Sequence, residues 1–187
     1  LREKDVSKRL SILLTQKITA ERMTCGDVAE TGRYPYTGTL GILSAEDKMI
    51  VREAMGLVGA EHLYDTDFRQ ISDGQRQCVM LARAIAQQPK IMLLDEPFGA
   101  IDAINRSNLQ DELLRIHRQS RKTFLFVTHD INEALKLGTK VLIMDKGQVQ
   151  QFAPPEEIVA HPANAFVESL IRTGRQDGDL VRPGEGI

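Results

Sequence analysis

Five polar side chains stand where a folded chain could bring them to one phosphate group. Each follows a short apolar run or opens a helix: Gln16, Ser72, Asp95, Glu96 and His129. A carboxylate at the end of a strand can hold Mg²⁺ through oxygen, and a neighbouring acid can orient or deprotonate an attacking water. A histidine can donate a hydrogen bond to a phosphate, and a hydroxyl beside the N–H groups that begin a helix favours an anion. These residue types fit phosphoryl chemistry.

Each of these signals also has an ordinary structural explanation when it stands alone. The Asp95-Glu96 pair could simply end a strand in water, and His129 could be a surface or core residue. The run Ser72-Asp73-Gly74 could be no more than a turn into a helix, because Ser and Asp cap helices and Gly tolerates unusual backbone angles. Only the order and spacing of the whole set favour a functional interpretation.

The elements that would position these residues follow from continuous apolar runs, which are typical of strands covered on both faces of a parallel sheet. Such runs occupy residues 11–14, 91–94, 123–127 and 140–144. Residues 102–118 between two of them have helical apolar spacing, so strand, helix and strand predict a βαβ unit and an α/β fold. The last run turns through residues 145–147 into residues 148–152, which predicts a hairpin at the sheet edge.

Residues 23–70 contain no comparable strand and predict a helical lobe inserted into the sheet domain. Ser44 and Asp47 resemble a capped helix start, and the apolar stripe that follows ends at Gly59. We therefore expect an α/β core over residues 1–22 and 88–172 and a helical lobe over residues 23–87. A short helix should begin at Pro154-Pro155, and residues 173–187 should form a flexible tail.

Composition excludes several classes of protein. The 24 Lys and Arg nearly balance the 26 Asp and Glu, and no basic run could follow a nucleic-acid backbone, so we expect no nucleic-acid partner. The two cysteines suit a reducing compartment. No apolar run approaches the roughly 20 residues needed to cross a bilayer. Because the first residues include neither a starting Met nor an apolar leader, we expect the chain to begin partway through a longer protein.

In order and spacing, the motifs together resemble the ATP-binding subunits of ABC transporters over nearly the whole chain. The corresponding segments are the Q-loop at Gln16, the signature motif at residues 71–75 with Gln77 and the helix 79–86 after it, the Walker B strand at residues 91–96, the D-loop at residues 99–102 and the switch histidine at residues 128–130.

The resemblance implies a fold, a chemistry and partners. The fold would be a partial P-loop NTPase core with a parallel sheet and an inserted helical lobe. Glu96 and His129 would be catalytic, and Asp95 and Gln16 would hold Mg²⁺. The residues that would contact ATP are Gln16, Ser72, Asp73, Gly74, Gln75 and Asp102. The partners would be a second ATP-binding subunit, which shares two sandwiched nucleotides, and membrane permease subunits that hold the protein at the inner face of the cell membrane.

Asp73 stands where many family members have Gly. The same replacement is familiar in the iron-chelate and haem importer branch. A carboxylate beside a phosphate site is tolerable only if it points away, so we expect Asp73 to act as a helix cap.

No Gly-x-x-x-x-Gly-Lys-Ser/Thr segment occurs in the 187 residues. That loop supplies the N–H cradle and the lysine for the β- and γ-phosphates, and a hydroxyl for Mg²⁺. We therefore expect the chain alone not to hydrolyse ATP. In the family's sheet, the strand leading into this loop lies between the strand before His129 and the strand at residues 141–144. Those two strands should either close against each other or leave an open edge.

The two halves of the chain resemble different groups of importers within the family. Residues 1–97, including residues 32–38, resemble iron-siderophore, haem and cobalamin importers, whereas residues from 98 onward, including residues 161–167, resemble glycine betaine and quaternary-amine importers. This pattern favours a recombinant or engineered chimera joined near residues 95–99, and the alternative is one divergent natural subunit.

The helical lobe contacts the permease in this family. The candidates for that contact are Tyr34, Pro35 and Tyr36, with a small aromatic packing cluster as the alternative.

The leading hypothesis is an ATP-hydrolysing importer subunit, truncated or chimeric here. The alternative is a non-catalytic interaction or folding fragment that keeps the dimer and permease surfaces. An ABC-type ATPase of DNA repair or translation is disfavoured, because no long coiled-coil heptads lie between Gln16 and Ile71.

Overall fold

The computed structural model describes residues 3–14, 22–38, 40–120 and 122–177, and the chain divides into two units. The first unit is Leu1–Val127 and the second is Thr128–Ile187. This boundary differs from the predicted one, because the strands at residues 10–13, 91–95 and 123–127 and the helical lobe belong to the same unit. Each unit is described by itself below.

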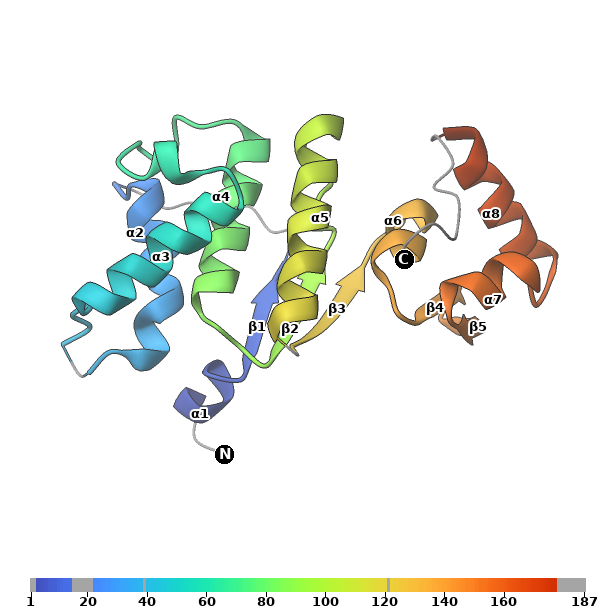
Figure 1. Ribbon diagram of the computed structural model, residues 1–187, viewed down its shortest axis with the longest axis horizontal. Helices are drawn as coiled ribbons and strands as arrows, with labels where there is room; N and C mark the ends of the chain where they lie inside the picture. Colours follow the sequence, from blue (N-terminus) through green and yellow to red (C-terminus); the bar gives the residue numbers. More distant parts are fainter. Residues whose placement is uncertain (1–2, 15–21, 39, 121, 178–187) are drawn as a thin grey trace. The chain divides into compact units, whose positions relative to one another are not determined.

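The first unit consists of a three-stranded sheet and the helices that precede and connect its strands (Figure 1). Its elements are α1 (Glu3–Ser7), β1 (Leu10–Leu13), α2 (Cys25–Glu30), the 3₁₀ helix η1 (Thr31–Tyr36), α3 (Ala45–Leu57), the 3₁₀ helix η2 (Glu61–Leu63), α4 (Asp73–Ala86), β2 (Ile91–Asp95), α5 (Ala103–Ser120) and β3 (Thr123–Val127). Among the described residues, no helix combines the length and the apolar composition that crossing a bilayer requires.

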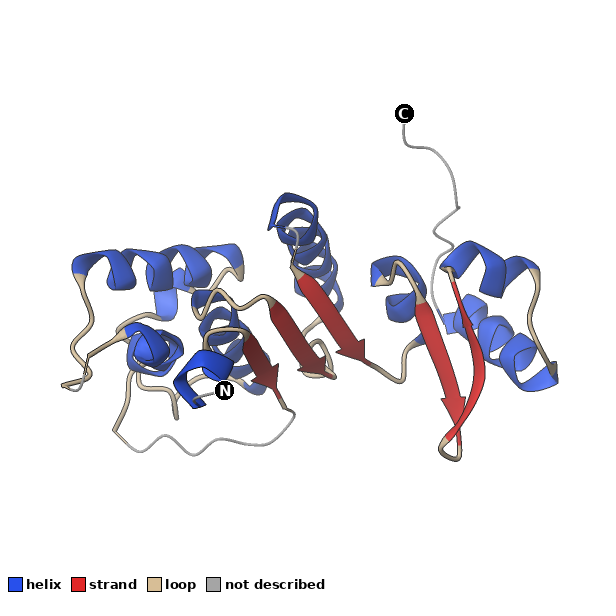
Figure 2. Ribbon diagram, turned by 90° about the horizontal axis from the view of Figure 1, so that it is seen from below, coloured by secondary structure: helices blue, strands red, loops and turns tan. Residues whose placement is uncertain are grey.

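The sheet has the order β1-β2-β3, and all three strands are parallel. This confirms the predicted α/β fold with a parallel sheet. One face of the sheet is buried, with Met92 and Leu94 fully enclosed. Helix α5 lies over one face of the sheet in Figure 2. This is the face of Met92, because the α5 residue His117 meets the ring of Phe124, the register partner of Met92, edge to face with 5.7 Å between ring centroids. Among the described residues, helices therefore cover one face of the sheet, whereas a parallel sheet is usually covered on both.

Reciprocal capping boxes set the start of each long helix in the lobe. The Ser44 hydroxyl accepts from the Asp47 N–H at 3.1 Å, and an Asp47 carboxylate oxygen accepts from the Ser44 N–H at 3.0 Å. This pair confirms the helix start predicted at Ser44. Thr24 with Asp27 and Ser72 with Gln75 form the same arrangement for α2 and α4. The three helices then pack around buried apolar side chains of α3 and α4: Val51, Met55, Val79 and Leu81.

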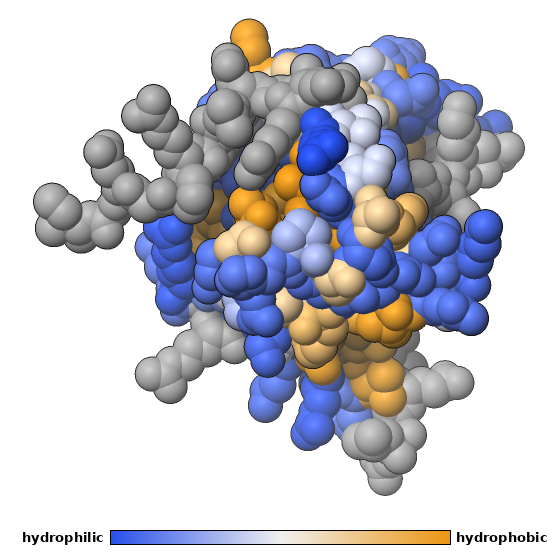
Figure 3. Space-filling model, turned by 90° about the vertical axis from the view of Figure 1, so that its right-hand side faces the viewer, coloured by the Kyte–Doolittle hydropathy of each residue, from blue (hydrophilic) through white to orange (hydrophobic). Residues whose placement is uncertain are grey.

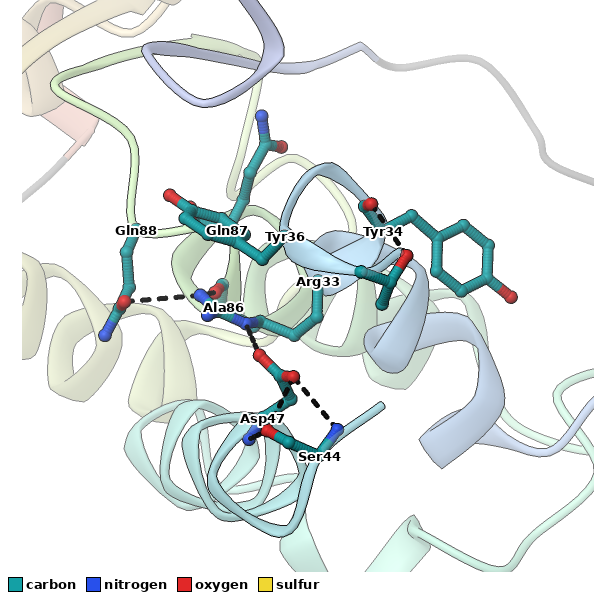
Figure 4. Close-up of polar contacts among 9 residues, drawn as sticks. Arg33, Tyr34, Tyr36, Ser44, Asp47, Ala86, Gln87 and Gln88 are labelled. Carbon is teal, nitrogen blue, oxygen red and sulfur yellow. Dashed lines mark hydrogen bonds and ion pairs between the residues drawn. The ribbon is translucent and has the colours of Figure 1, made fainter. Parts of the chain in front are cut away.

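A buried ion pair ties η1 to α3 and to the end of α4 (Figure 4). The Arg33 Nε donates to the Asp47 carboxylate at 2.8 Å, and its Nη1 donates to the Ala86 carbonyl at 2.9 Å and to the Gln88 side chain at 3.2 Å. Burial alone would raise the pKa of Asp47, but the hydrogen bonds from Ser44 and Arg33 outweigh it and lower that pKa. The carboxylate therefore stays charged inside the lobe.

A second set of contacts joins the lobe to the sheet. The Gln87 side-chain amide donates to the Ser7 carbonyl and, at 2.8 Å, to the Leu10 carbonyl at the start of β1. The Tyr36 hydroxyl donates to the Gln87 carbonyl at 2.9 Å, and the Arg33 guanidinium lies 3.9 Å from the centre of the Tyr36 ring. These contacts explain why the predicted lobe and the sheet strands form one unit.

The second unit packs three helices on a hairpin. Its elements are α6 (Ile131–Leu137), β4 (Val141–Asp145), β5 (Gln148–Ala153), α7 (Pro155–Ala160) and α8 (Ala165–Asp177). The predicted hairpin is confirmed, and Lys146 and Gly147, with φ of 48° and 77°, make the two-residue turn that favours a tight antiparallel pair. The helix predicted at Pro154-Pro155 is also confirmed.

Two predictions about this unit need correction. The hairpin forms its own two-stranded sheet rather than an edge of the parallel sheet, since β4 pairs only with β5 among the described residues. The tail predicted from residue 173 is wrong for residues 173–177, because α8 continues to Asp177. The apolar face of α8 packs into the core of the unit, with Val167 and Ile171 buried beside Ile158. Within the extension, the Gly174 carbonyl accepts from the Asn132 side-chain amide of α6 at 2.9 Å, which holds this part of α8 against the unit.

The hairpin has an apolar outer face as well as its buried one. The buried face contributes Val141, Ile143 and Ala153 to the core. The outer face exposes Leu142, Met144, Val149 and Phe152. Apolar surface between charged side chains is visible on the side of the molecule in Figure 3.

We expect Asp47→Ala to lower the free energy of unfolding by about 3 kcal/mol, because it leaves the Arg33 charge buried and also removes the α3 capping box. Urea unfolding at pH 7 measures the change. Glu46→Ala, an exposed change in the same helical turn, is the matched control and should cost a few tenths of a kcal/mol. Because the pKa of Asp47 is lowered by folding, its contribution should be present above about pH 4 and be lost as pH falls through the folded pKa. Equal losses for the two variants would contradict a structural role for the ion pair.

Candidate functional site

The N-terminus of α4 carries the residues of the predicted signature motif. Ser72 is the N-cap, and its hydroxyl accepts from the Gln75 N–H at 3.2 Å while the Gln75 side chain accepts from the Ser72 N–H at 2.9 Å. These two hydrogen bonds cap α4 and fix the residue at which the helix begins. Ser72 remains exposed, so its hydroxyl is also accessible to a ligand.

Asp73 does not cap the helix, and that prediction is wrong. It is the first residue of α4, and its carboxylate pairs with Arg76 at 2.7 Å. Arg76 in turn donates to the Arg69 carbonyl at 3.0 Å and to the Phe68 carbonyl at 3.3 Å. Ser72 caps instead because its short side chain sits one residue before the helix, where the hydroxyl reaches the third N–H. The Asp73 charge is thereby partly balanced on the helix surface.

Gly74 and Gln77 hold α4 against the segment that follows β2. A Cβ at Gly74 would lie 2.7 Å from the Ala100 carbonyl oxygen, so only glycine permits this close approach. The Gln77 Nε2 donates to the Glu96 carbonyl at 2.6 Å, and the Ala100 N–H donates to the Gln77 Oε1 at 2.9 Å. One side-chain amide thus bridges both ends of the segment from Glu96 to Ala100.

Asp95 and Glu96 lie at the carboxyl end of β2, as predicted. Asp95 pairs with Val127 in the sheet register, and the Glu96 N–H donates to the Val127 carbonyl at 2.9 Å. Glu96 has a φ of 47°, a conformation that costs a non-glycine residue roughly 1–2 kcal/mol. The surrounding hydrogen bonds hold this strained turn, which is common where a side chain is positioned for function.

A cleft of about 1060 Å³ opens between the lobe and the start of α5. Its lining includes Ser72, Asp73, Gly74, Gln75 and Asp102, so the structure brings together five of the six predicted nucleotide contacts. The sixth, Gln16, lies outside the described residues. Asp95 and Glu96 do not line this cleft, and Glu96 is connected to it through Gln77.

The cleft is acidic rather than basic. The backbone N–H of Asn105, followed by its side chain, holds the pKa of Asp102 below its usual value, so this carboxylate keeps its charge. Burial, then the Asp102 charge, raises the pKa of the neighbouring Cys78 thiol. Where the structure describes the lining of the cleft, it contains no Lys or Arg. An anion held there would depend on backbone N–H groups and on cations supplied from elsewhere.

His129 is exposed and lies in the second unit, two residues before α6 begins. Its neighbour Asp130 caps that helix by accepting from the Asn132 N–H at 2.8 Å. The first unit therefore contains the signature residues and the two acids, and the histidine is carried by the other unit. Within the described residues, no group of three or more His, Cys, Asp or Glu side chains could enclose a metal ion. Asp95 offers the oxygen that Mg²⁺ prefers but would need further ligands.

Sequence reasoning noted Gln77 only as a residue that the resemblance leads one to expect, and it assigned no role to it. The structure makes it the link between α4 and the segment after β2. The only signal in the sequence is its place five residues beyond Ser72 on the helix, which does not by itself indicate a contact with Glu96.

Comparison with known proteins identifies the family. The ABC transporter family model matches residues 2–99. The glycine betaine/carnitine transport ATP-binding protein GbuA of Listeria monocytogenes is 44% identical over 70% of this chain and 33% of its own length. An ABC transporter ATP-binding protein of Methanocaldococcus jannaschii, MJ0873, is 35% identical over 85% of this chain and 55% of its own. The sulfate/thiosulfate import ATP-binding protein CysA of Bradyrhizobium diazoefficiens is 45% identical over 72% of this chain and 41% of its own length.

Two solved structures have the same fold. An inward-facing ABC transporter of the metal-chelate type superposes with a TM-score of 0.75 at 24% identity, over 88% of this chain and 64% of that chain. The dimeric bacterial ABC transporter cassette MJ0796 superposes with a TM-score of 0.72 at 26% identity, over 83% of this chain and 68% of that chain. This chain spans from one third to just over half of the length of the three curated relatives. The family match covers just over half of the residues, and the chain belongs to the ABC transporter family.

Proposed function

We propose that the chain is an ATP-binding subunit of an ABC importer, in which α4 presents its N-terminus to a nucleotide held by a second ATP-binding subunit. The observation that carries the proposal is the Gln77 bridge, which fixes Ser72 and Gly74 beside Asp102 and next to the backbone of Glu96. GbuA is named for glycine betaine/carnitine transport and CysA for sulfate/thiosulfate import, which supports an importer. The transported solute stays open, because an ATP-binding subunit does not contact it.

The proposed chemistry assigns one task to each side chain at the end of β2. Mg²⁺, when bound, would neutralise charge on the β- and γ-phosphates. Asp95 would contribute an oxygen ligand to it, and Gln16 a second. Glu96 would orient or deprotonate the attacking water, and His129 would donate a hydrogen bond to the γ-phosphate.

We further propose that this chain does not hydrolyse ATP by itself. The 187 residues contain no phosphate-loop motif, and the cleft beside α4 is lined by acids without a Lys or Arg. A triphosphate would therefore meet few positive charges on this chain. The alternative function is a non-catalytic interaction fragment that keeps the dimer and permease surfaces, and the same two observations favour it.

The two tyrosines of η1, Tyr34 and Tyr36, lie in different surroundings. Tyr36 packs under Arg33, and its hydroxyl bonds to Gln87, whereas Tyr34 is 52% exposed. We propose that Tyr34, beside Pro35, contacts the permease and that Tyr36 supports the lobe. We retain the proposal of a seam near residues 95–99 between an iron-chelate-type front half and a betaine-type back half. With this seam, the lobe would select an iron-chelate-type permease, which would place the protein at the inner face of the membrane.

Calorimetric titration of the chain with MgATP should give no saturable heat up to about 1 mM nucleotide, because the main phosphate grip is lacking. Phosphate release should equal that of the Glu96→Gln variant, which controls for contaminating ATPases. Turnover that disappears in Glu96→Gln would contradict the proposed inactivity. ATP binding without turnover would contradict the interaction-fragment alternative.

Tyr34→Ala should leave the urea midpoint nearly unchanged and reduce capture of the chain by an iron-chelate-type permease in detergent. Tyr36→Ala should lower the free energy of unfolding by about 1–2 kcal/mol, because it removes a hydrogen bond and a cation–π contact. A betaine-type permease serves as the parallel bait. Unchanged permease capture by Tyr34→Ala would assign both tyrosines to packing.

A further inference from the structure

The turn that carries His129 is organised by the hydroxyl of Thr128. The Thr128 Oγ1 donates to a carboxylate oxygen of Glu133 at 2.9 Å and accepts from the Asp130 N–H at 3.1 Å. Thr128 and Asp130 lie on either side of His129 in the chain. A single hydroxyl, which is both a donor and an acceptor, therefore fixes the backbone before and after the histidine.

This arrangement differs from an ordinary capping box. Asp130 is the N-cap of α6, and Glu133 is the third residue of the helix. In a capping box the acid at this position accepts directly from the N–H of the N-cap residue, as Asp47 does from Ser44. At α6 the Thr128 hydroxyl stands between the two groups, since it accepts from the Asp130 N–H and donates to Glu133. The carboxylate of Glu133 thus acts on residues that precede the helix.

The Glu133 side chain lies in the interior of the second unit, with an exposed fraction of 7%. Burial of a carboxylate is costly unless hydrogen bonds compensate it. The Asp130 side chain already caps α6 by accepting from the N–H groups of Asn132 and Glu133, so the cap does not require a buried acid. A buried acceptor holds the Thr128 hydroxyl in one orientation, which an exposed and mobile carboxylate would not do.

Helix α6, which carries Glu133, is itself anchored in the second unit. Ile131 is buried in the core of this unit. The Asn132 side-chain amide donates to the Gly174 carbonyl of α8 at 2.9 Å, and a Cβ at Gly174 would collide with the Ile131 side chain. Because His129 is exposed, its position depends on the anchored turn more than on burial of its own ring.

We propose that Glu133 is a positioning residue for His129 and that it acts through the hydroxyl of Thr128. The carboxylate orients the hydroxyl, the hydroxyl holds the Asp130 N–H, and the histidine between them is presented in one direction. This inference rests on the proposed function, in which His129 donates a hydrogen bond to the γ-phosphate. A histidine whose backbone is already fixed loses less conformational entropy when it makes that bond.

The test measures the backbone order parameter of the His129 amide by ¹⁵N relaxation in the 187-residue chain without nucleotide. The unaltered chain should give a value of about 0.85, which is typical of rigid backbone. Thr128→Val removes the hydroxyl at nearly constant volume, and Glu133→Leu removes the acceptor. Each should lower the order parameter of His129 below about 0.6. Glu133→Gln keeps an acceptor oxygen and should retain the rigid value.

Thr173→Val is the matched control, because it removes an exposed hydroxyl of the same unit, which donates to the Ser169 carbonyl. This variant should leave the order parameter of His129 unchanged. The amide of His161, in the same unit, should stay unchanged in every variant. A role in stability alone would shift the urea midpoint without selectively loosening His129.

The proposal is overturned if Thr128→Val leaves His129 as rigid as in the unaltered chain, or if Thr173→Val loosens it equally. It is also overturned if Glu133→Gln loosens His129 as much as Glu133→Leu does. Should Glu133→Leu fail to fold, the comparison of Thr128→Val with Thr173→Val decides. Because the samples contain no nucleotide, the result is independent of the ATP titration, whose failure would remove the γ-phosphate role and leave the positioning of His129 intact.

Discussion

The side-chain amide of Gln77 is the contact on which the candidate site depends. Its nitrogen holds the carbonyl of Glu96, and its oxygen holds the N–H of Ala100, so the N-terminal half of α4 and the segment after β2 cannot move independently. The absence of a side chain at Gly74 allows the two to approach this closely. This contact fixes the N-terminal half of α4, which carries Ser72 and Gly74 at its start, against the residues that follow the carboxylates of β2.

The hydrogen bonds of Arg33 hold the other elements of the lobe together. A buried guanidinium requires a charged partner and filled hydrogen-bonding positions, which Asp47, Ala86 and Gln88 supply. The neighbouring Gln87 carries the connection onward to β1. The lobe is thus held to the sheet by directional contacts whose loss would leave buried groups unpaired. This explains why it does not separate as an independent unit.

The two faces of the sheet in the first unit differ. Its strands were predicted to be covered on both faces, and among the described residues the helices cover one. On the other face Ile12, Leu125 and Val127 are exposed. The exposed outer face of the β4–β5 hairpin shows the same one-sided burial in the second unit. Apolar surface of this kind favours association, so partners for both units are a physical expectation of the fold.

Local chemistry, read from the sequence alone, determined the strands predicted at residues 91–94 and 123–127, the capped start of α3, the hairpin turn within residues 145–147 and the family motifs. Each depends on a short range of residues, and capping boxes and apolar runs act within a few positions. The Ser72 cap of α4 is equally local, because Ser72 and Gln75 have the spacing of a capping box. The tertiary structure alone decided that Gln77 bridges to Glu96 and that β4 forms a separate sheet. It also decided that the lobe joins the sheet strands through Gln87. These outcomes depend on which distant groups meet and which backbone positions remain unpaired, and such long-range competition leaves no signal in a short stretch of sequence.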